Sequence, residues 1–258
     1  PHAPRTRAAV EAGGVNRFWL ALGFLTTLPA RPVPYVPGGL GRAAAWFPVI
    51  GLLIGVLLLL VQSAAALLLG PAVAAVLVIV LWAVLTGGLH LDGLADCCDG
   101  LLVSAPRERR LEIMRDPRVG SFAVTGLVLV LILKAAAVFS LPGGSTVAPA
   151  LVLAPVWARW WILLAARRPP ARADGLGSSF GTALTPQILG IALVLPLVML
   201  GVAAWFDWRS LVGVALSGLA CLGVLRLAQA RIGGMTGDVL GAVVELTEVA
   251  LLLGMVRP

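Results

Sequence analysis

Residues 87–100 read GGLHLDGLADCCDG and place Asp92, Asp96 and Asp99 at positions i, i+4 and i+7. On a helix of about 3.6 residues per turn, the three carboxylates fall within roughly 60° of one face. Like charges on one helix face repel each other, so this pattern is a poor choice for stability alone. A hard cation such as Mg²⁺ would offset the repulsion, because it binds carboxylate oxygens and keeps water ligands that a phosphate can replace. The stretch predicts a helix with a metal site, and the alternative is a solvated helix face just outside a membrane.

The composition predicts an integral membrane protein. Of the 258 residues, 60% are hydrophobic and 12% are charged, which is about half the charged share of an average soluble domain. The formal net charge of +7 would also suit nucleic acid, but the basic residues lie in loops beside apolar segments, and membrane topology explains them better. Nucleic acid is therefore not an expected partner. The three cysteines, Cys97, Cys98 and Cys221, show no metal-ligand spacing and are interpreted as small apolar residues.

Apolar segments long enough to cross a bilayer alternate with polar loops. The expected spans are residues 43–69, 72–89, 121–140, 147–166, 184–206 and 211–230. Residues 15–28 are too short to span with certainty and precede a proline-rich link, which predicts an interfacial or re-entrant helix. Residues 241–256 are apolar except for Glu245 and Glu248, and the sequence leaves open whether they span or re-enter.

These features predict an all-α fold, a polytopic membrane bundle of about 6–7 transmembrane helices with an N-terminal interfacial helix. We expect a single membrane-embedded domain over residues 1–258. Within it, residues 1–14 are expected to be flexible and residues 90–120 to form the active-site segment on the cytoplasmic side.

The arginines divide the loops into a basic side and an almost uncharged side. The basic side receives Arg42, five arginines between 107 and 118, Arg167, Arg168, Arg172, Arg226 and Arg231, and the other side receives Arg209. The positive-inside rule makes the basic side cytoplasmic, so we expect a multi-pass protein of the cell inner membrane. Residues 87–100 and the polar stretch 233–238 both fall on this side. Two candidate functional stretches that lie far apart in the sequence therefore face one compartment.

A second acidic stretch, residues 233–248, reads GGMTGDVLGAVVELTE. Asp238, Glu245 and Glu248 follow i, i+7 and i+10 spacing, which is one broad helix face. Acids inside an apolar segment require partners, water or a cation. The glycines, among them Gly237, permit a close backbone approach or a phosphate-cradling turn.

Basic side chains supply candidates for phosphate binding. Guanidinium groups bind phosphate oxygens in pairs, and the candidates are Arg115, Arg118 and Arg159. The alternative for loop arginines is ordinary positive-inside charge, and for Arg159 and Lys134, which lie within spans, it is snorkelling to the surface. His90 immediately precedes the aspartates and is a candidate general base or ligand, with a packing role as the alternative.

At these residues the chain resembles the cobalamin synthase family, the adenosylcobinamide-GDP ribazoletransferases. The stretches that carry the resemblance occur in the family's order and are GGLHLDGLADCCDG, LEIMRDPRVGSF, the pair Arg159-Trp160, GLGSSF at 175–180 and GGMTGDVLGAVVELTE. The resemblance covers most of residues 18–253. It implies that the 5′ oxygen of α-ribazole, or of α-ribazole 5′-phosphate, attacks the cobinamide-linked phosphorus of adenosylcobinamide-GDP. GMP leaves, and the nucleotide loop of adenosylcobalamin is completed.

The resemblance also implies a dependence on Mg²⁺ and a role for each candidate residue. The expected metal ligands are Asp92, Asp96, Asp99, Asp238 and Glu245, although Asp238 and Glu245 would alternatively hold the ribazole. Asp99 or His90 would accept the proton of the nucleophile, and analogy with other Asp-rich transferases favours Asp99. The expected contacts to the phosphates are Arg115, Arg118, Arg159 and Gly237.

Two other functions remain open at this point. A CDP-alcohol phosphotransferase of phospholipid synthesis would form a lipid product, but residues 87–100 lack the arginine that such enzymes carry there. A cation-coupled transporter would use buried acids as an ion path. Transporter sites often lie near the bilayer midplane between inverted repeats, whereas here the acids cluster at one membrane surface and no repeat is visible. The expected partners are the two small-molecule substrates and membrane lipid. The sequence leaves the oligomeric state open, with a homo-oligomer as one alternative.

Overall fold

The computed structural model describes residues 13–34, 36, 38–141, 147–172 and 180–256, and every regular element in these ranges is a helix. The helices are α2 (Gly14–Leu25), α3 (Gly39–Ala43), the 3-10 turn η1 (Ala44–Trp46), α4 (Phe47–Leu69), α5 (Pro71–Leu85), α6 (Leu89–Leu102), α7 (Arg107–Ile113), α8 (Ser121–Phe139), α9 (Val147–Ala166), α11 (Pro186–Phe206), α12 (Arg209–Ile232) and α13 (Gly237–Met255). The predicted all-α fold is confirmed. The prediction for residues 1–14 falls almost wholly outside the described residues.

Within the described residues, five helical segments are long and apolar enough to cross a membrane, and they make the chain a multi-pass membrane protein. They are Gly39–Leu69, Ser121–Phe139, Val147–Ala166, Pro186–Phe206 and Arg209–Ile232. Helices α5 and α6 pass the same test only as a pair, and they are bent by 91° at the break between them. Counted with this pair, the described residues contain six candidate spans, which is the lower end of the expected 6–7, and without it they contain five.

The break between α5 and α6 corrects the expected straight span at 72–89. Helix α5 ends at Leu85, and Gly87 and Gly88 follow with φ of +60° and +70°. These left-handed conformations cost glycine little and other residues more. They turn the chain so that α6 leaves in a new direction.

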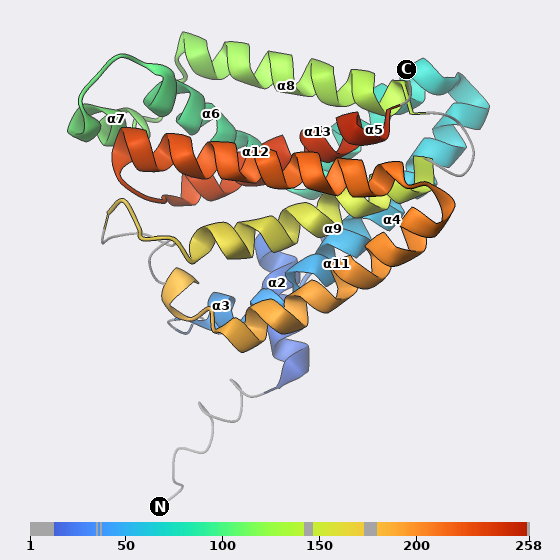
Figure 1. Cartoon of the computed structure of the whole chain (residues 1–258), viewed down its shortest axis with the longest axis horizontal. Coiled ribbons are helices and arrows are strands. Elements are labelled where there is room, and N and C mark those ends of the chain that lie inside the picture. Colours follow the sequence, from blue (N-terminus) through green and yellow to red (C-terminus); the bar gives the residue numbers. More distant parts are fainter. Residues whose placement is uncertain (1–12, 35, 37, 142–146, 173–179, 257–258) are drawn as a thin grey trace, which may run out of the picture.

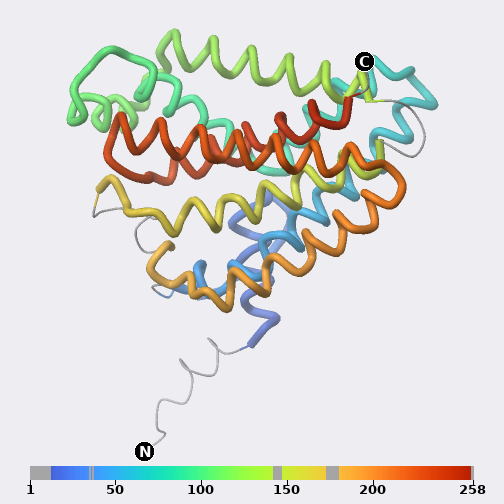
Figure 2. The backbone as a smooth tube through the Cα atoms, viewed as in Figure 1, coloured from blue at the N-terminus to red at the C-terminus, as the bar shows by residue number. Residues whose placement is uncertain are grey.

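Helix α13 lies in the interior of the bundle. It packs against α6, α9 and α12, and most of its residues are buried. Glycines allow close approach: a Cβ built on Gly254 would lie 2.5 Å from the Cα of Gly213 in α12. Small residues at such contacts are typical of helices packed in membranes. Figure 2 shows the chain reversing between α12 and α13, so that the acidic C-terminal stretch runs back through the bundle.

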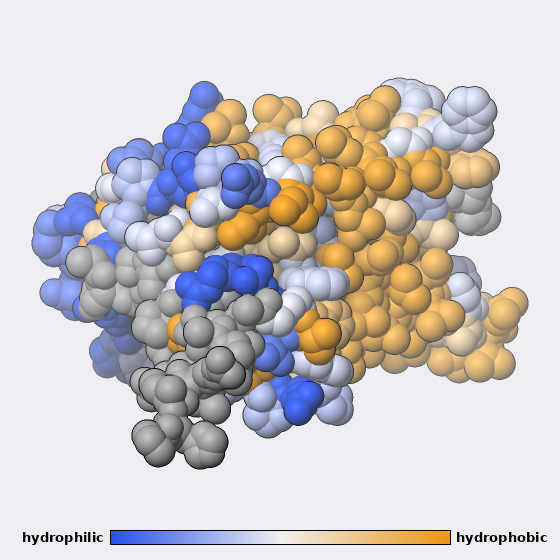
Figure 3. Space-filling view, turned by 90° about the horizontal axis from the view of Figure 1, so that it is seen from below, coloured by the Kyte–Doolittle hydropathy of each residue, from blue (hydrophilic) through white to orange (hydrophobic). Residues whose placement is uncertain are grey.

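The molecule has one polar end and one apolar end. The long helices α8, α9, α11 and α12 run along the longest axis, and α7 lies at one end of it (Figure 1). Hydrophilic residues gather toward that end and hydrophobic residues cover most of the other half (Figure 3). The end that carries α7 also holds the start of α8 and the turn between α12 and α13. The two candidate functional stretches meet at this polar end.

Candidate active site

The aspartate triplet lies on α6, as its spacing predicts. The helix begins directly after the glycine turn, with Asp92 in its first turn, where a negative charge interacts favourably with the helix dipole. Asp92 is exposed, and Asp96 and Asp99 are partly buried. Asp92 is therefore at the surface of the protein, whereas Asp96 and Asp99 are partly covered by neighbouring residues.

Helices α6 and α13 meet backbone to backbone at this point. A Cβ built on Gly93 would lie 2.7 Å from the carbonyl oxygen of Asp238, and a Cβ on Gly241 would lie 3.2 Å from the Cα of Gly93. These contacts bring the two acidic stretches together. Side chains of both stretches line one cavity of about 180 Å³, which we call the acidic pocket. Its polar lining residues are His90, Asp92 and Asp238, and Gly237 also lines it.

Asp238 already has two hydrogen-bond partners beside this pocket. The Arg172 guanidinium donates to its Oδ2 over 3.2 Å, and the Thr236 hydroxyl lies 3.1 Å from the same oxygen. Arg172 was not among the sequence candidates, because it lies in a loop with several other arginines and no local pattern distinguishes it. No described residue donates a hydrogen bond to Asp92 or Asp96. Among the described residues, Arg172 therefore pairs with Asp238, and the carboxylates of Asp92 and Asp96 have no such partner.

Asp99 has a different position from the other two aspartates. Its Oδ2 accepts from the Gly120 backbone N–H over 2.6 Å, and its Oδ1 accepts from the Ala123 N–H over 2.9 Å. These N–H groups are in the first turn of α8, where no carbonyl of the same helix is available to them. Asp99 thus caps α8 from a neighbouring helix. Both of its oxygens are occupied, which argues against its predicted roles as metal ligand and proton acceptor.

The acidic pocket fits a hard divalent cation in its chemistry, although the side chains do not yet enclose one. Carboxylates of Asp92, Asp96 and Asp238 come from two contacting helices, and such oxygens are the ligands that Mg²⁺ prefers. Within the described residues, no three His, Cys, Asp or Glu side chains are grouped closely enough to hold an ion. Coordination would require these flexible side chains to turn toward a common point.

Glu245 belongs to a separate cluster deep in the bundle. Lys134 donates to Glu245 over 3.0 Å and to Glu248 over 2.5 Å, and Arg159 donates to the other oxygen of Glu248. All four side chains are almost completely inaccessible to solvent. Lys134 also lies 3.9 Å from the centre of the Trp82 ring, a cation–π contact. Two cations balance two carboxylates, so the cluster needs no added ion.

This cluster corrects three interpretations. Lys134 donates to Oε2 of Glu245, and Glu245 does not line the acidic pocket, so we no longer place it among the metal ligands. Arg159 is 0% exposed and does not line the acidic pocket, so it is unsuited to bind a substrate phosphate. Lys134 does not snorkel, because its ammonium is held by two carboxylates inside the protein.

His90 is a buried residue that lines the acidic pocket. It is 2% exposed, and neither ring nitrogen has a hydrogen-bond partner in the structure. A buried polar group without a partner costs free energy unless a ligand or water satisfies it. This observation favours a functional role for His90 over the packing alternative.

Arg107 and Arg110 stabilise the fold around α7 by donating hydrogen bonds to backbone carbonyls. Arg110 donates to the carbonyls of Gly100 and Leu101 at the end of α6, and Arg107 donates to carbonyls in two other segments. The candidates Arg115 and Arg118 are exposed and do not line the acidic pocket.

The charge pair at Asp116 and Arg118 shapes the loop before α8. Arg118 donates to both oxygens of Asp116. Those hydrogen bonds lower the pKa of Asp116 from 3.8 to about 2. The Arg118 side chain stays 86% exposed, which leaves it accessible to a phosphate that arrives from solution.

The comparison with known proteins identifies the family. A family model described as cobalamin-5-phosphate synthase matches residues 17–256. The chain belongs to the cobalamin-5-phosphate synthase family. The matched region includes both acidic stretches and every helix from α4 to α13.

Relatives in this family are similar over almost their whole length. The adenosylcobinamide-GDP ribazoletransferase of Pseudomonas entomophila (strain L48) is 44% identical over 246 residues, which cover 92% of this chain and 97% of the relative. The protein of the same name from Brevibacillus brevis is 35% identical over 248 residues, 94% of this chain and 98% of the relative. No solved structure matches the chain.

Proposed function

We propose that this protein transfers the adenosylcobinamide-phosphate group of adenosylcobinamide-GDP to α-ribazole or α-ribazole 5′-phosphate and releases GMP. Near-full-length similarity to ribazoletransferases supports the reaction. The observation that carries the proposal is the meeting of Asp92 and Asp238 in one pocket that also holds His90. Two carboxylates that could bind a cation, a histidine without a hydrogen-bond partner and the neighbouring Arg172 are side chains suited to transferring a phosphoryl group from a diphosphate.

The reaction exchanges one phosphorus–oxygen bond for another. The 5′ oxygen of the acceptor forms a bond to the phosphorus attached to cobinamide, and the bond from that phosphorus to the oxygen bridging to GMP breaks. The hydroxyl proton must leave as the new bond forms. We propose His90 as the group that accepts it, in preference to Asp99, because His90 lines the pocket and has both nitrogens free.

Residues in and beside the acidic pocket would bind the phosphates of the donor. Arg172 is placed to donate to a phosphate oxygen beside Asp238, since guanidinium groups bind phosphates strongly. We propose that Asp92, Asp96 and Asp238 hold Mg²⁺, with Gly237 allowing the phosphates to approach the start of α13. A bound Mg²⁺ would supply charge stabilisation for the diphosphate and for the departing GMP.

We further propose that the polar end, and with it the acidic pocket, faces the cytoplasm across the inner membrane. The arginine-rich loops support this orientation by the positive-inside rule.

The test is a direct assay with the purified protein in detergent. Adenosylcobinamide-GDP and α-ribazole, with Mg²⁺, should yield GMP and adenosylcobalamin in equal amounts. Asp92→Asn and Asp238→Asn should each lower the rate at least about 100-fold, since each removes charge from the site of phosphoryl transfer. Glu108→Gln is the matched control, because Glu108 is an exposed acid at the same polar end. Full activity of both Asp variants, or activity that survives EDTA, would contradict the site or its metal.

A further inference from the structure

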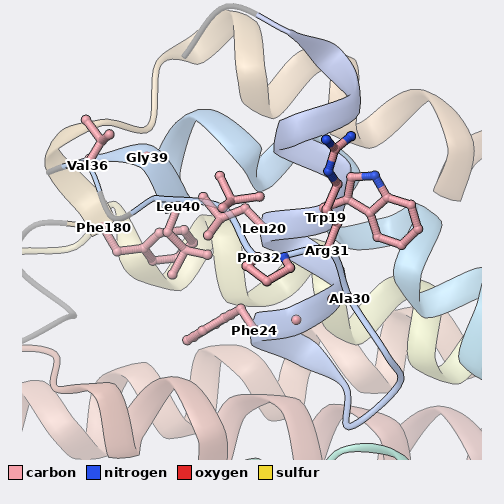
Figure 4. A pocket seen from close by; sticks show the side chains of 13 residues that line it. Trp19, Leu20, Phe24, Ala30, Arg31, Pro32, Val36, Gly39, Leu40 and Phe180 are labelled. Atoms are coloured by element: carbon pink, nitrogen blue, oxygen red, sulfur yellow. The ribbon is translucent and has the colours of Figure 1, made fainter. Parts of the chain in front are cut away.

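A second cavity, of about 440 Å³, lies beside the acidic pocket and no role has yet been given to it. We call it the N-terminal pocket; α2, residues 30–33, Val36, α3 and Phe180 surround it. Trp19 and Arg31 lie together on one side of it, and Leu40 and Phe180 lie on the opposite side (Figure 4). Arg31 is the one charged residue among its described lining residues. The cavity is therefore an aromatic and aliphatic chamber with a single cation at its edge.

The N-terminal pocket adjoins the acidic pocket. Phe24, Leu40 and Phe180 line both cavities. A molecule that filled the larger cavity and passed these three side chains would reach Asp92 and Asp238. The two cavities thus suit one ligand with an apolar body and a polar end.

The shared wall is fixed by aromatic stacking. Phe47, at the start of α4, stacks on Phe24 with ring centres 6.1 Å apart and on Phe180 with ring centres 5.6 Å apart. A Cβ built on Gly41 would lie 2.8 Å from the Phe180 carbonyl oxygen, so α3 holds this segment closely. A wall that is already in place costs little ordering on binding.

We propose that the N-terminal pocket binds the bicyclic aromatic base of ribazole, with the ribose extending into the acidic pocket. This inference rests on the proposed function and adds a binding site for the acceptor, α-ribazole. The ribose 5′ oxygen then lies on the side of His90 and Asp92. An aromatic base gains from stacking on rings such as Phe24 and Trp19.

The chemistry of the lining selects this occupant over the other reactant. A benzimidazole base carries no amino or carbonyl group, and its one free ring nitrogen is its only hydrogen-bonding atom, so a largely apolar chamber suits it. Guanine carries both, and burying them without hydrogen-bond partners would cost free energy. The corrin ring with its side chains is too bulky for a cavity of about 440 Å³. A lipid acyl chain is the remaining apolar occupant, and the test below separates it.

Kinetics with each substrate varied in turn test the assignment. Phe24→Ala should raise the KM for α-ribazole at least about fivefold, because loss of one base-stacking ring typically has an effect of that size or larger. The KM for adenosylcobinamide-GDP should stay within about twofold. Phe18→Ala is the control, because Phe18 is an aromatic residue on the same helix that lines neither pocket.

A second variant fills the cavity instead of enlarging it. Gly39 lines the N-terminal pocket, and a Cβ there would meet neighbours at ordinary distances of 3.5 and 3.9 Å. Gly39→Leu should therefore raise the KM for α-ribazole. Gly190→Leu is the control, because Gly190 lines neither pocket and a Cβ there meets nothing within 4 Å. Free dimethylbenzimidazole should compete with α-ribazole and not with adenosylcobinamide-GDP in the unaltered protein, and Gly39→Leu should weaken that competition.

Two results would overturn the assignment. One is a rise in the KM for adenosylcobinamide-GDP in place of that for α-ribazole. The other is unchanged kinetics in both Phe24→Ala and Gly39→Leu, with activity that depends instead on added phospholipid, which would make the cavity a lipid site. If the unaltered protein forms no product, the proposed function fails. Equilibrium dialysis of free dimethylbenzimidazole against the purified protein and Gly39→Leu would still decide the pocket.

Discussion

A Cβ built on Gly93 of α6 would lie 2.7 Å from the carbonyl oxygen of Asp238 in α13, so the two helices touch at their backbones. This contact decides where the acids meet, because it sets Asp92 and Asp238 on the lining of one pocket. Any side chain at position 93 would have to push the helices apart. The geometry of the acidic pocket thus depends on the absence of a side chain at Gly93.

Replacing Gly93 should therefore disable the site. Gly93→Val would collide with backbone atoms that cannot turn aside, and overpacking of this kind typically costs about 1–3 kcal/mol of stability. We expect the transferase rate to fall at least about tenfold and the thermal unfolding temperature in detergent to drop. Gly223→Ala is the control, because a Cβ on Gly223 meets nothing within 4 Å. Normal activity of Gly93→Val would show that the two helices need not touch.

Asp99 should act mainly through the start of α8. Asp99→Ala removes the acceptor for the Gly120 and Ala123 N–H groups, and loss of a helix cap typically costs about 0.5–2 kcal/mol. The unfolding temperature should fall, and Asp99→Asn, which keeps one oxygen acceptor, should lose less. An unchanged unfolding temperature combined with lost activity would instead return Asp99 to the metal or proton-transfer role predicted from the sequence.

Lys134 should be essential for stability and not for chemistry. Lys134→Met leaves Glu245 and Glu248 without their shared cation in a buried site, and breaking a buried ion pair on one side typically costs about 3–5 kcal/mol. The double variant with Glu245→Gln should recover part of that loss. Thermal unfolding of the single and double variants in detergent measures the coupling. Strictly additive losses would mean that the two groups do not interact.

Arg172 should bind the phosphates of the donor substrate. We expect Arg172→Ala to raise the KM for adenosylcobinamide-GDP about tenfold or more, because a charge-assisted hydrogen bond to phosphate is lost. Arg172→Lys should recover part of the affinity, since the charge is kept while paired donation is not. Arg167→Ala is the comparison: Arg167 donates to the Leu184 carbonyl at the same end of the bundle. Equal effects of the two alanine variants would point to general surface charge.

The sequence predicts the local parts of the site well. Hydropathy and helical spacing are properties of neighbouring residues, so the all-α membrane bundle and the shared helix face of Asp92, Asp96 and Asp99 follow from residues 87–100 and their surroundings. The distribution of arginines likewise placed both acidic stretches at one end. Those predictions needed no knowledge of which helices touch.

Periodicity alone could not separate Asp238 from Glu245. The two lie on one face of α13, but seven residues of helix separate them by about 10.5 Å along the axis. Asp238 therefore reaches the polar end, while Glu245 lies at the depth where Lys134 of α8 enters the bundle. The partner of each acid depends on which helices pack around α13.

The sequence by itself determined the kinds of element and which segments are apolar enough to cross a membrane, because these depend on short-range spacing and on transfer of side chains from water to lipid. Only the tertiary structure decided that Asp99 caps α8, that Glu245 and Arg159 balance charges in the interior, and that Arg172 and an aromatic chamber adjoin Asp238. Each of these contacts joins helices distant in the chain. Such contacts are set by how the surfaces of the helices fit together. Local sequence patterns do not show which helices lie next to each other.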